Sequence, residues 1–225
     1  MTVPGRSGER EPTCRSSRRP LVETARRRAV IFRQLFDSTS GTYTYLIASR
    51  HGGEALIIDP VLDRVDRYIQ LVRELDLRLV KAVDTHLHAD HITGLGALRD
   101  RTHCVTVMGE RSNVDVVSMR LAEGDKLTIE GVALDVLYTP GHTDDSYSFL
   151  MQDRVFTGDT LLIRGTGRTD FQNGDARAQY ESVRPAAETA RGNAGVSGTR
   201  LQGRHGQHDR RGKEVQPAVA GEIGR

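Results

Sequence analysis

Three histidines and one aspartate stand within six positions of this chain, directly after a short apolar segment. The apolar segment, Leu79–Asp84, has the length and composition of a buried strand. The polar side chains that follow it are His86, His88, Asp90 and His91. Crowding three imidazoles and a carboxylate together is unfavourable unless a cation neutralises and orders them. Side chains at i and i+2 of an extended segment point alike, so His86 and His88 can reach one ion. A solvated polar loop is the plain alternative.

Two later segments supply further candidate ligands, each at the end of an expected strand. His142 follows the strand expected at 132–139, and Asp159 follows the strand expected at 155–157. A single histidine or aspartate in such a place is more often a hydrogen-bonded structural or turn residue. Together with the histidine run, they favour a metal site where loops from several strands meet.

The apolar pattern predicts strands first and then a strand–turn–helix order. Helices are expected at Arg64–Leu75, with Asp63 as its N-cap, and at Gly94–Arg101. Strands are expected at Ala29–Phe36, Thr42–Ala48, Glu54–Asp59, Leu79–Asp84, Val105–Met108, Lys126–Ile129, Val132–Thr139, Tyr147–Met151 and Val155–Thr157. This order indicates a mixed α/β domain with sheets inside and helices outside, in four layers if the sheets stack.

Composition divides the chain into three parts. Residues 1–28 form a leader rich in Arg, Ser, Pro and Glu, and residues 183–225 form a tail rich in Arg, Gly, Gln and Ala. Neither part can bury enough apolar surface to offset its chain entropy, so we expect both to be disordered. The globular domain is therefore expected at 29–182. Cys14 and Cys104 suit a reducing compartment, and no apolar run reaches the length of a membrane span, which favours a cytoplasmic protein with no membrane partner.

The histidine run, the Pro140-Gly141-His142 turn and Thr157-Gly158-Asp159 together resemble the metallo-β-lactamase superfamily. The resemblance covers Ile31 to Tyr180 and implies a four-layer αββα sandwich. Two stretches are similar to the persulfide dioxygenase (sulfur dioxygenase) subgroup. The first contains Phe36, Asp37, Ser40, Tyr43, Tyr45 and Leu46, and the second, more specific one runs from Leu162 to Gln172.

This resemblance implies an iron-dependent oxidoreductase that converts glutathione persulfide, O2 and water to sulfite and glutathione. His86, His142 and Asp159 would hold one Fe(II) per chain, with His88, Asp90 and His91 as the surrounding shell or a second metal site. Two histidines and one carboxylate leave positions open on the ion for a thiolate and O2. Arg168 would anchor a glutathione carboxylate, since a guanidinium binds it bidentately. Arg164 is a second candidate, for which a loop-stabilising salt bridge is an equal alternative.

Binuclear zinc hydrolases of the glyoxalase II (hydroxyacylglutathione hydrolase) type share the same histidine run and form the main alternative. There His88 would join the first zinc, and Asp90 with His91 would bind the second. Asp159 would bridge two Zn(II) ions, and a metal-bound hydroxide would attack a thioester. The second zinc also needs a histidine from the last third of the chain. An inactive, truncated family member is the other alternative within this fold.

The segment after Tyr180 departs from the resemblance, which implies a helix, a strand and a Pro-Ala-His-Asp-Tyr segment there. Codons can be chosen for Ser197–Asp209 that encode this very segment when they are read one base downstream. We therefore hypothesise a one-base shift near 183–185, which leaves the sandwich incomplete at its C-terminal end. His205 and His208 would then be products of the altered frame. The three proposed iron ligands lie upstream of the shift.

A nucleic-acid-binding tail is a hypothesis from a different class. Its basic residues are Arg191, Arg200, Arg204, Arg210, Arg211 and Lys213. Acidic residues dilute this charge and no aromatic side chains interleave for base stacking, so we expect no nucleic-acid partner. The sequence leaves open whether the chain forms a homodimer.

Overall fold

The computed structural model describes Met1 and residues 30–115, 117–162, 165–192 and 200–202. The strands are β1 (Ile31–Asp37), β2 (Thr42–Ala48), β3 (Glu54–Ile58), β4 (Arg78–Val83), β5 (Val105–Gly109), β6 (Met119–Leu121), β7 (Lys126–Ile129), β8 (Val132–Tyr138), β9 (Tyr147–Met151), β10 (Arg154–Phe156) and β11 (Arg200–Gln202). The helices are η1 (Leu62–Arg64), α1 (Val65–Glu74), α2 (Leu95–Thr102) and α3 (Ala176–Gly192).

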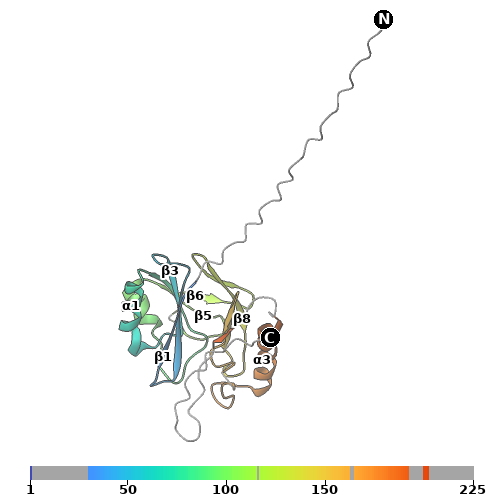
Figure 1. Cartoon of the computed structure of the whole chain (residues 1–225). Coiled ribbons are helices and arrows are strands. Elements are labelled where there is room, and N and C mark those ends of the chain that lie inside the picture. Colours follow the sequence, from blue (N-terminus) through green and yellow to red (C-terminus); the bar gives the residue numbers. More distant parts are fainter. Residues whose placement is uncertain (2–29, 116, 163–164, 193–199, 203–225) are drawn as a thin grey trace.

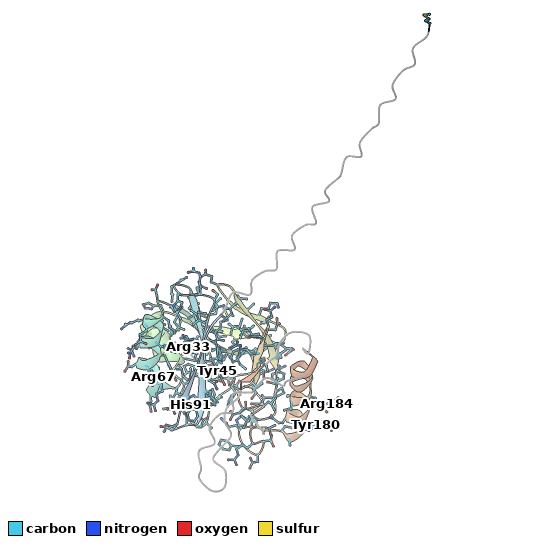
Figure 2. All side chains as sticks on the ribbon, viewed as in Figure 1. Arg33, Tyr45, Arg67, His91, Tyr180 and Arg184 are labelled. Atoms are coloured by element: carbon cyan, nitrogen blue, oxygen red, sulfur yellow. The ribbon has the colours of Figure 1, made fainter. Side chains whose placement is uncertain are left out.

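The strands form two sheets that pack face to face (Figure 1). The first has the order β1-β2-β3-β4-β5-β6, antiparallel from β1 to β3 and parallel from β3 to β6. The second has the order β11-β10-β9-β8-β7, with β11 parallel to β10 and the others antiparallel. The helices α1 and α2 cover the first sheet, and α3 lies beyond the second. In Figure 2, Arg67 on α1 and Tyr180 on α3 mark opposite sides of the molecule. The expected four-layer αββα order is confirmed.

The first sheet is buried on both faces, and the alternation along β3 shows how. Leu56 and Ile58 point into the core between the two sheets, whereas Ala55 and Ile57 point into a second core beneath α1 and α2. All four side chains are fully buried. A strand covered on both faces requires a continuous apolar run, which this segment has. The second sheet differs, because Ala133 and Asp135 of β8 are exposed while their neighbours are buried.

Most expected elements are confirmed within one or two residues, but three were missed. The strands β6 and β11 have three residues each, too short to show a periodic pattern. The helix α3 continues past the expected domain end at residue 182 to Gly192, and β11 lies further along the chain. The structure therefore extends into the tail that was expected to be disordered. The proposed leader, residues 193–199 and residues 203–225 lie outside the described residues.

The predicted N-cap of the first helix was wrong. Asp63 lies within the 3-10 turn η1, and Arg64 is the N-cap of α1, with no side-chain hydrogen bond to the helix. The backbone N–H of Arg64 instead reaches the carbonyl oxygen of Val61 at 3.1 Å, which closes the 3-10 turn before α1 begins. In the described part of the chain, no helix combines the length and the apolar character that crossing a bilayer requires.

Candidate metal centre

Three loops from both sheets meet at one end of the sandwich. His86 follows β4, His142 follows β8 and Asp159 follows β10. Ligand atoms of these three residues all lie within 4.8 Å of one another. The side chains are buried, with exposed fractions of 2%, 8% and 7% for the three residues in chain order. The structure thus brings together the three residues that the sequence nominated, although 73 residues separate His86 from Asp159.

The orientation of His86 depends on Asp59, a residue that follows β3. Asp59 accepts hydrogen bonds from the backbone N–H of Thr85 at 2.7 Å and from the Thr85 hydroxyl at 3.1 Å. Because that hydroxyl donates to Asp59, it accepts a hydrogen bond from Nδ1 of His86, 2.9 Å away. Such an arrangement places the proton of His86 on Nδ1, so that Nε2 carries the lone pair that a metal would bind.

The orientation of His142 depends on a backbone carbonyl. Nδ1 of His142 lies 2.7 Å from the carbonyl oxygen of Arg168, and Nε2 lies 3.5 Å from Oδ2 of Asp159. Nδ1 therefore donates to Arg168, and Nε2 faces the carboxylate across the space that the three residues share. Gly167 is required for this approach, since a Cβ there would lie 2.5 Å from the carbonyl oxygen of Asp159 and 2.8 Å from Nδ1 of His142.

A second group of candidate ligands lies beside the first. Ligand atoms of His88, Asp90 and His91 also lie within 4.8 Å of one another. The side chains of His88 and His91 are 4% exposed, and that of Asp90 is 25% exposed. Buried Nδ1 of His88 and Nε2 of His91 have no hydrogen-bond partner among the described residues. Buried ring nitrogens without partners are unfavourable unless they bind a cation or water.

Side chains outside the histidine run hold this second group in place. Nε2 of His88 lies 3.2 Å from Oδ1 of Asp59, so the same aspartate orients residues of both groups. The hydroxyl of Thr42 lies 3.0 Å from Oδ2 of Asp90 and 3.2 Å from Nδ1 of His91. This threonine begins β2, so the antiparallel pair β1–β2 supports the loop after β4.

Carboxylates dominate the electrostatics around His88. Burial lowers the pKa of His88, but its hydrogen bond to Asp59 and the charges of Asp59, Asp84 and Asp90 outweigh burial and raise this pKa to about 9. Burial raises the pKa of Asp84, although the charge of His88 opposes the shift. The raised pKa of His88 thus reflects the carboxylates around it, whereas the raised pKa of Asp84 reflects mainly its own burial.

Residues 165–173, which follow Asp159 along the chain, contact all three ligand-bearing loops. The N–H of Gly167 donates to the carbonyl oxygen of Asp159 at 2.7 Å, and the side-chain amide of Gln172 donates to the carbonyl oxygen of Leu87 at 3.0 Å. Gln172 and Asn173 both adopt left-handed backbone conformations, with φ of 47° and 58°. Such residues are uncommon outside turns and functional sites. This segment therefore forms one wall of the candidate metal centre.

The guanidinium of Arg168 lies on the exposed side of this wall. Its Nε and Nη2 donate to the two carboxylate oxygens of Asp170 at 2.8 and 2.9 Å, and the side chain is 65% exposed. Its guanidinium carbon also lies 5.7 Å from the ring centre of Phe171, which is itself exposed. A substrate carboxylate would therefore share the Arg168 guanidinium with Asp170 or displace Asp170 from it. Arg164, the other proposed anchor, lies outside the described residues.

Several positioning residues were not found from the sequence. Asp59 and Thr85 are the clearest of them, and Asp145 is another, since its carboxylate accepts from the hydroxyl of Thr143 at 2.7 Å and from the N–H of Leu87 at 3.1 Å. A signal for Asp59 was present. Asp59 follows β3, a buried strand that runs parallel to β4. The two strands therefore end at the same sheet edge, and Asp59 lies near His86.

The fold and the three loops define the class of protein. The sequence profile of the metallo-beta-lactamase superfamily matches residues 38–194, and the chain therefore belongs to that superfamily. The chain is 44% identical over 181 residues to the mouse protein named persulfide dioxygenase ETHE1, mitochondrial, covering 79% of this chain and 71% of the mouse protein. The crystal structure of ETHE1 from Myxococcus xanthus is 48% identical, with a TM-score of 0.73 over 80% of this chain and 77% of that one. Within the superfamily, the chain is a member of the persulfide dioxygenase family.

A hydroxyacylglutathione hydrolase is a more distant relative. The protein of that name from Idiomarina loihiensis is 31% identical over 126 residues, which cover 56% of this chain and 49% of the hydrolase. The likeness is lower and shorter than the likeness to the persulfide dioxygenases, so the family assignment favours the oxygenase over the hydrolase.

Proposed function

We propose that this protein is an iron-dependent persulfide dioxygenase that converts glutathione persulfide, O2 and water to sulfite and glutathione. The observation that carries the proposal is the buried group of His86, His142 and Asp159, with ligand atoms within 4.8 Å of one another. Two imidazoles and one carboxylate suit Fe(II) and leave ligand positions open for substrates. In this reaction the terminal sulfur of the persulfide is oxidised and O2 is reduced, and the thiol leaves as glutathione.

The chain's own residues fit such a centre through their hydrogen bonds. Nδ1 of His86 contacts the Thr85 hydroxyl and Nδ1 of His142 contacts the carbonyl oxygen of Arg168, so Nε2 of each ring would bind the ion. Nε2 of His142 already faces Asp159. When bound, Fe(II) supplies the redox chemistry with O2 that side chains lack. Arg168 and Arg164 are proposed to bind a glutathione carboxylate at the mouth of the site.

One observation favours the binuclear zinc hydrolase as a second candidate. His88, Asp90 and His91 form a compact group with two unpartnered ring nitrogens among the described residues, as a second cation would need. This second ion also requires a final histidine, which the family resemblance places in a Pro-Ala-His-Asp-Tyr segment of the tail. The tail has His205 and His208 but no such segment. We therefore favour a single iron at the first group, with the second group acting as its polar shell. A catalytically inactive chain remains the third outcome of the test.

The tail and the cellular setting stay predictions. We propose that a one-base shift near 183–185 altered the reading frame, and resequencing the gene across codons 180–225 tests this directly. An unaltered frame on resequencing, together with the absence of such a slip in the genes of close relatives, contradicts it. A cytoplasmic location is also a prediction, whereas the name of the mouse relative places that protein in mitochondria. Whether two copies associate can be measured by light scattering.

O2 uptake with metal analysis tests the proposed function. The full chain, purified without oxygen and loaded with one equivalent of Fe(II), is expected to consume O2 and release sulfite when glutathione persulfide is added. The same chain loaded with Zn(II) is expected to show neither. Hydrolysis of a glutathione thioester by protein holding two zinc ions, without persulfide-dependent O2 uptake, contradicts the proposal and supports the hydrolase.

A further inference from the structure

Helix α3 packs directly against the turn that carries His142. Gly141 has a φ of 142°, and a Cβ there would lie 2.3 Å from Cα and N of Gln179. The backbone N–H of Asp175 donates to the carbonyl oxygen of Gly141 at 2.8 Å, and the hydroxyl of Ser182 donates to that of Pro140 at 2.6 Å. The turn before His142 thus rests on the first two turns of α3.

One side chain of α3 also reaches the second ligand-bearing turn. The side-chain amide nitrogen of Gln179 donates to the carbonyl oxygen of Thr160, the residue next to Asp159. Gln179 is 4% exposed, so this contact is buried. Gln179 therefore touches the turn of His142 through its backbone and the turn of Asp159 through its side chain.

The amide of Gln179 is poorly explained by folding alone. Its Oε1 is buried and has no hydrogen-bond partner among the described residues. Burying a polar atom without a partner costs stability, and that cost offsets the gain from the bond to Thr160. Polar groups that contribute little to the fold are expected mainly at functional sites. The directional bond to Thr160 fixes the place of one turn relative to the other.

We propose that Gln179 is a positioning residue that sets the separation of His142 and Asp159 for metal binding. It acts through Gly141 and Thr160 and does not itself contact the ion. The inference rests on the proposed metal site, but it does not depend on which reaction that site performs. Groups behind metal ligands are often needed for affinity, and their loss weakens metal binding by about 10–100-fold.

Co(II) binding to the full chain tests the proposal, because the visible absorption of Co(II) reports its ligand geometry. The variant Gln179→Leu removes the amide and keeps the apolar part of the side chain. We expect its dissociation constant for Co(II) to rise about tenfold and its absorption bands to shift. Thermal unfolding of its metal-free form is expected to stay close to that of the wild-type chain.

Two further variants keep the test decisive. Ile129→Val removes one buried methyl group from β7, at the edge of the second sheet, and should lower thermal stability without changing Co(II) affinity or spectrum. Gln179→Met is unbranched and of similar length, and it replaces Gln179→Leu if that variant fails to fold. Wild-type affinity and spectrum in the Gln179 variants overturn the proposal. Wild-type protein that binds no Co(II) contradicts the metal site itself, and this proposal with it.

Discussion

The two groups of candidate ligands are built in different ways. His86, His142 and Asp159 come from three loops on two sheets, whereas His88, Asp90 and His91 all come from one loop. The first group exists only when both sheets are folded and packed together. The second needs only a local turn and the support of Thr42 and Asp59. Burial separates only one residue, because the side chain of Asp90 is 25% exposed while those of His88 and His91 are as buried as the first group.

This difference supports the proposal that the first group holds the reactive metal. A buried site assembled from distant residues has its geometry fixed by the whole fold, which is what a redox centre with open positions requires. A group within one loop can adjust, and here its atoms hydrogen-bond to the surrounding protein. The following predictions test that division, beginning with the largest expected effect.

Replacing Asp159 should remove the reactive metal. We expect Asp159→Ala to lower iron content to background and to reduce persulfide-dependent O2 uptake by about 100-fold or more, since it removes the only carboxylate of the first group. Iron analysis and an oxygen electrode measure both. Asp66→Ala, on the exposed surface of α1, is the control and should match the wild type. Full iron content in Asp159→Ala would mean that the ion binds elsewhere.

Replacing Asp59 should affect both groups at once. Asp59→Asn keeps the size of the side chain but weakens its acceptance of hydrogen bonds from Thr85 and His88, so we expect metal affinity to fall about 10–100-fold. Competition with a metal chelator measures this affinity. Asp63→Asn, in the exposed turn before α1, should leave it unchanged. Equal affinities in the two variants would contradict the role given to Asp59.

Replacing His91 should have a smaller effect if the second group is a shell. We expect His91→Ala to retain one iron per chain and to lose less than about tenfold in O2 uptake. His51→Ala, an exposed histidine between β2 and β3, is the matched control. Loss of one of two bound zinc ions, together with loss of thioester hydrolysis, would instead support the binuclear hydrolase.

The smallest effect on the metal centre is expected at Asp37, because it supports the second group only indirectly, through Ser40 and Thr42. The Ser40 hydroxyl lies 2.8 Å from Asp37 and 2.9 Å from the Thr42 hydroxyl. Burial raises the pKa of Asp37, but hydrogen bonds from Ser40 and Arg64 outweigh burial and lower it below 3.8. Asp37→Asn should therefore lower the free energy of unfolding by about 2 kcal/mol at neutral pH.

The pH dependence of this effect has a definite sign. Because the pKa of Asp37 is lowered on folding, its contribution is fully present above 3.8 and disappears as the pH falls through the folded-state value. Urea unfolding at pH 7 and pH 3 should therefore show a larger difference between wild type and Asp37→Asn at pH 7. A difference that grows on acidification would contradict this account.

The sequence was most informative where ligands and strands carry local patterns. The histidine run, the strand ends before His142 and Asp159, and nine of the strands are visible in residue spacing alone. Thr85 and Gln179 could not be found in that way, because their importance comes from contacts between distant segments, whereas Asp59 was overlooked although it ends a predicted strand. Asp63 shows the converse. Its residue type favours an N-cap, but the backbone forms a 3-10 turn at this position.

The boundary between the domain and the tail shows what composition alone leaves out, whereas the disorder expected for the rest of the tail stays a prediction. The tail's scarcity of aliphatic residues suggested disorder after residue 182, yet α3 continues to Gly192. The first turns of α3 are fixed by contacts with the His142 turn, and five alanines favour the helix although the interior Pro185 disfavours it. A helix anchored at one end can extend beyond the packed region.

Anomalous diffraction at the iron absorption edge tests the central claim most directly. Crystals of the full chain loaded with Fe(II) should give one anomalous peak per chain, within about 2.0–2.2 Å of a nitrogen of His86, a nitrogen of His142 and an oxygen of Asp159. Two peaks of comparable height, with one bound by His88, Asp90 and His91, or a single peak at that second group, would contradict the account.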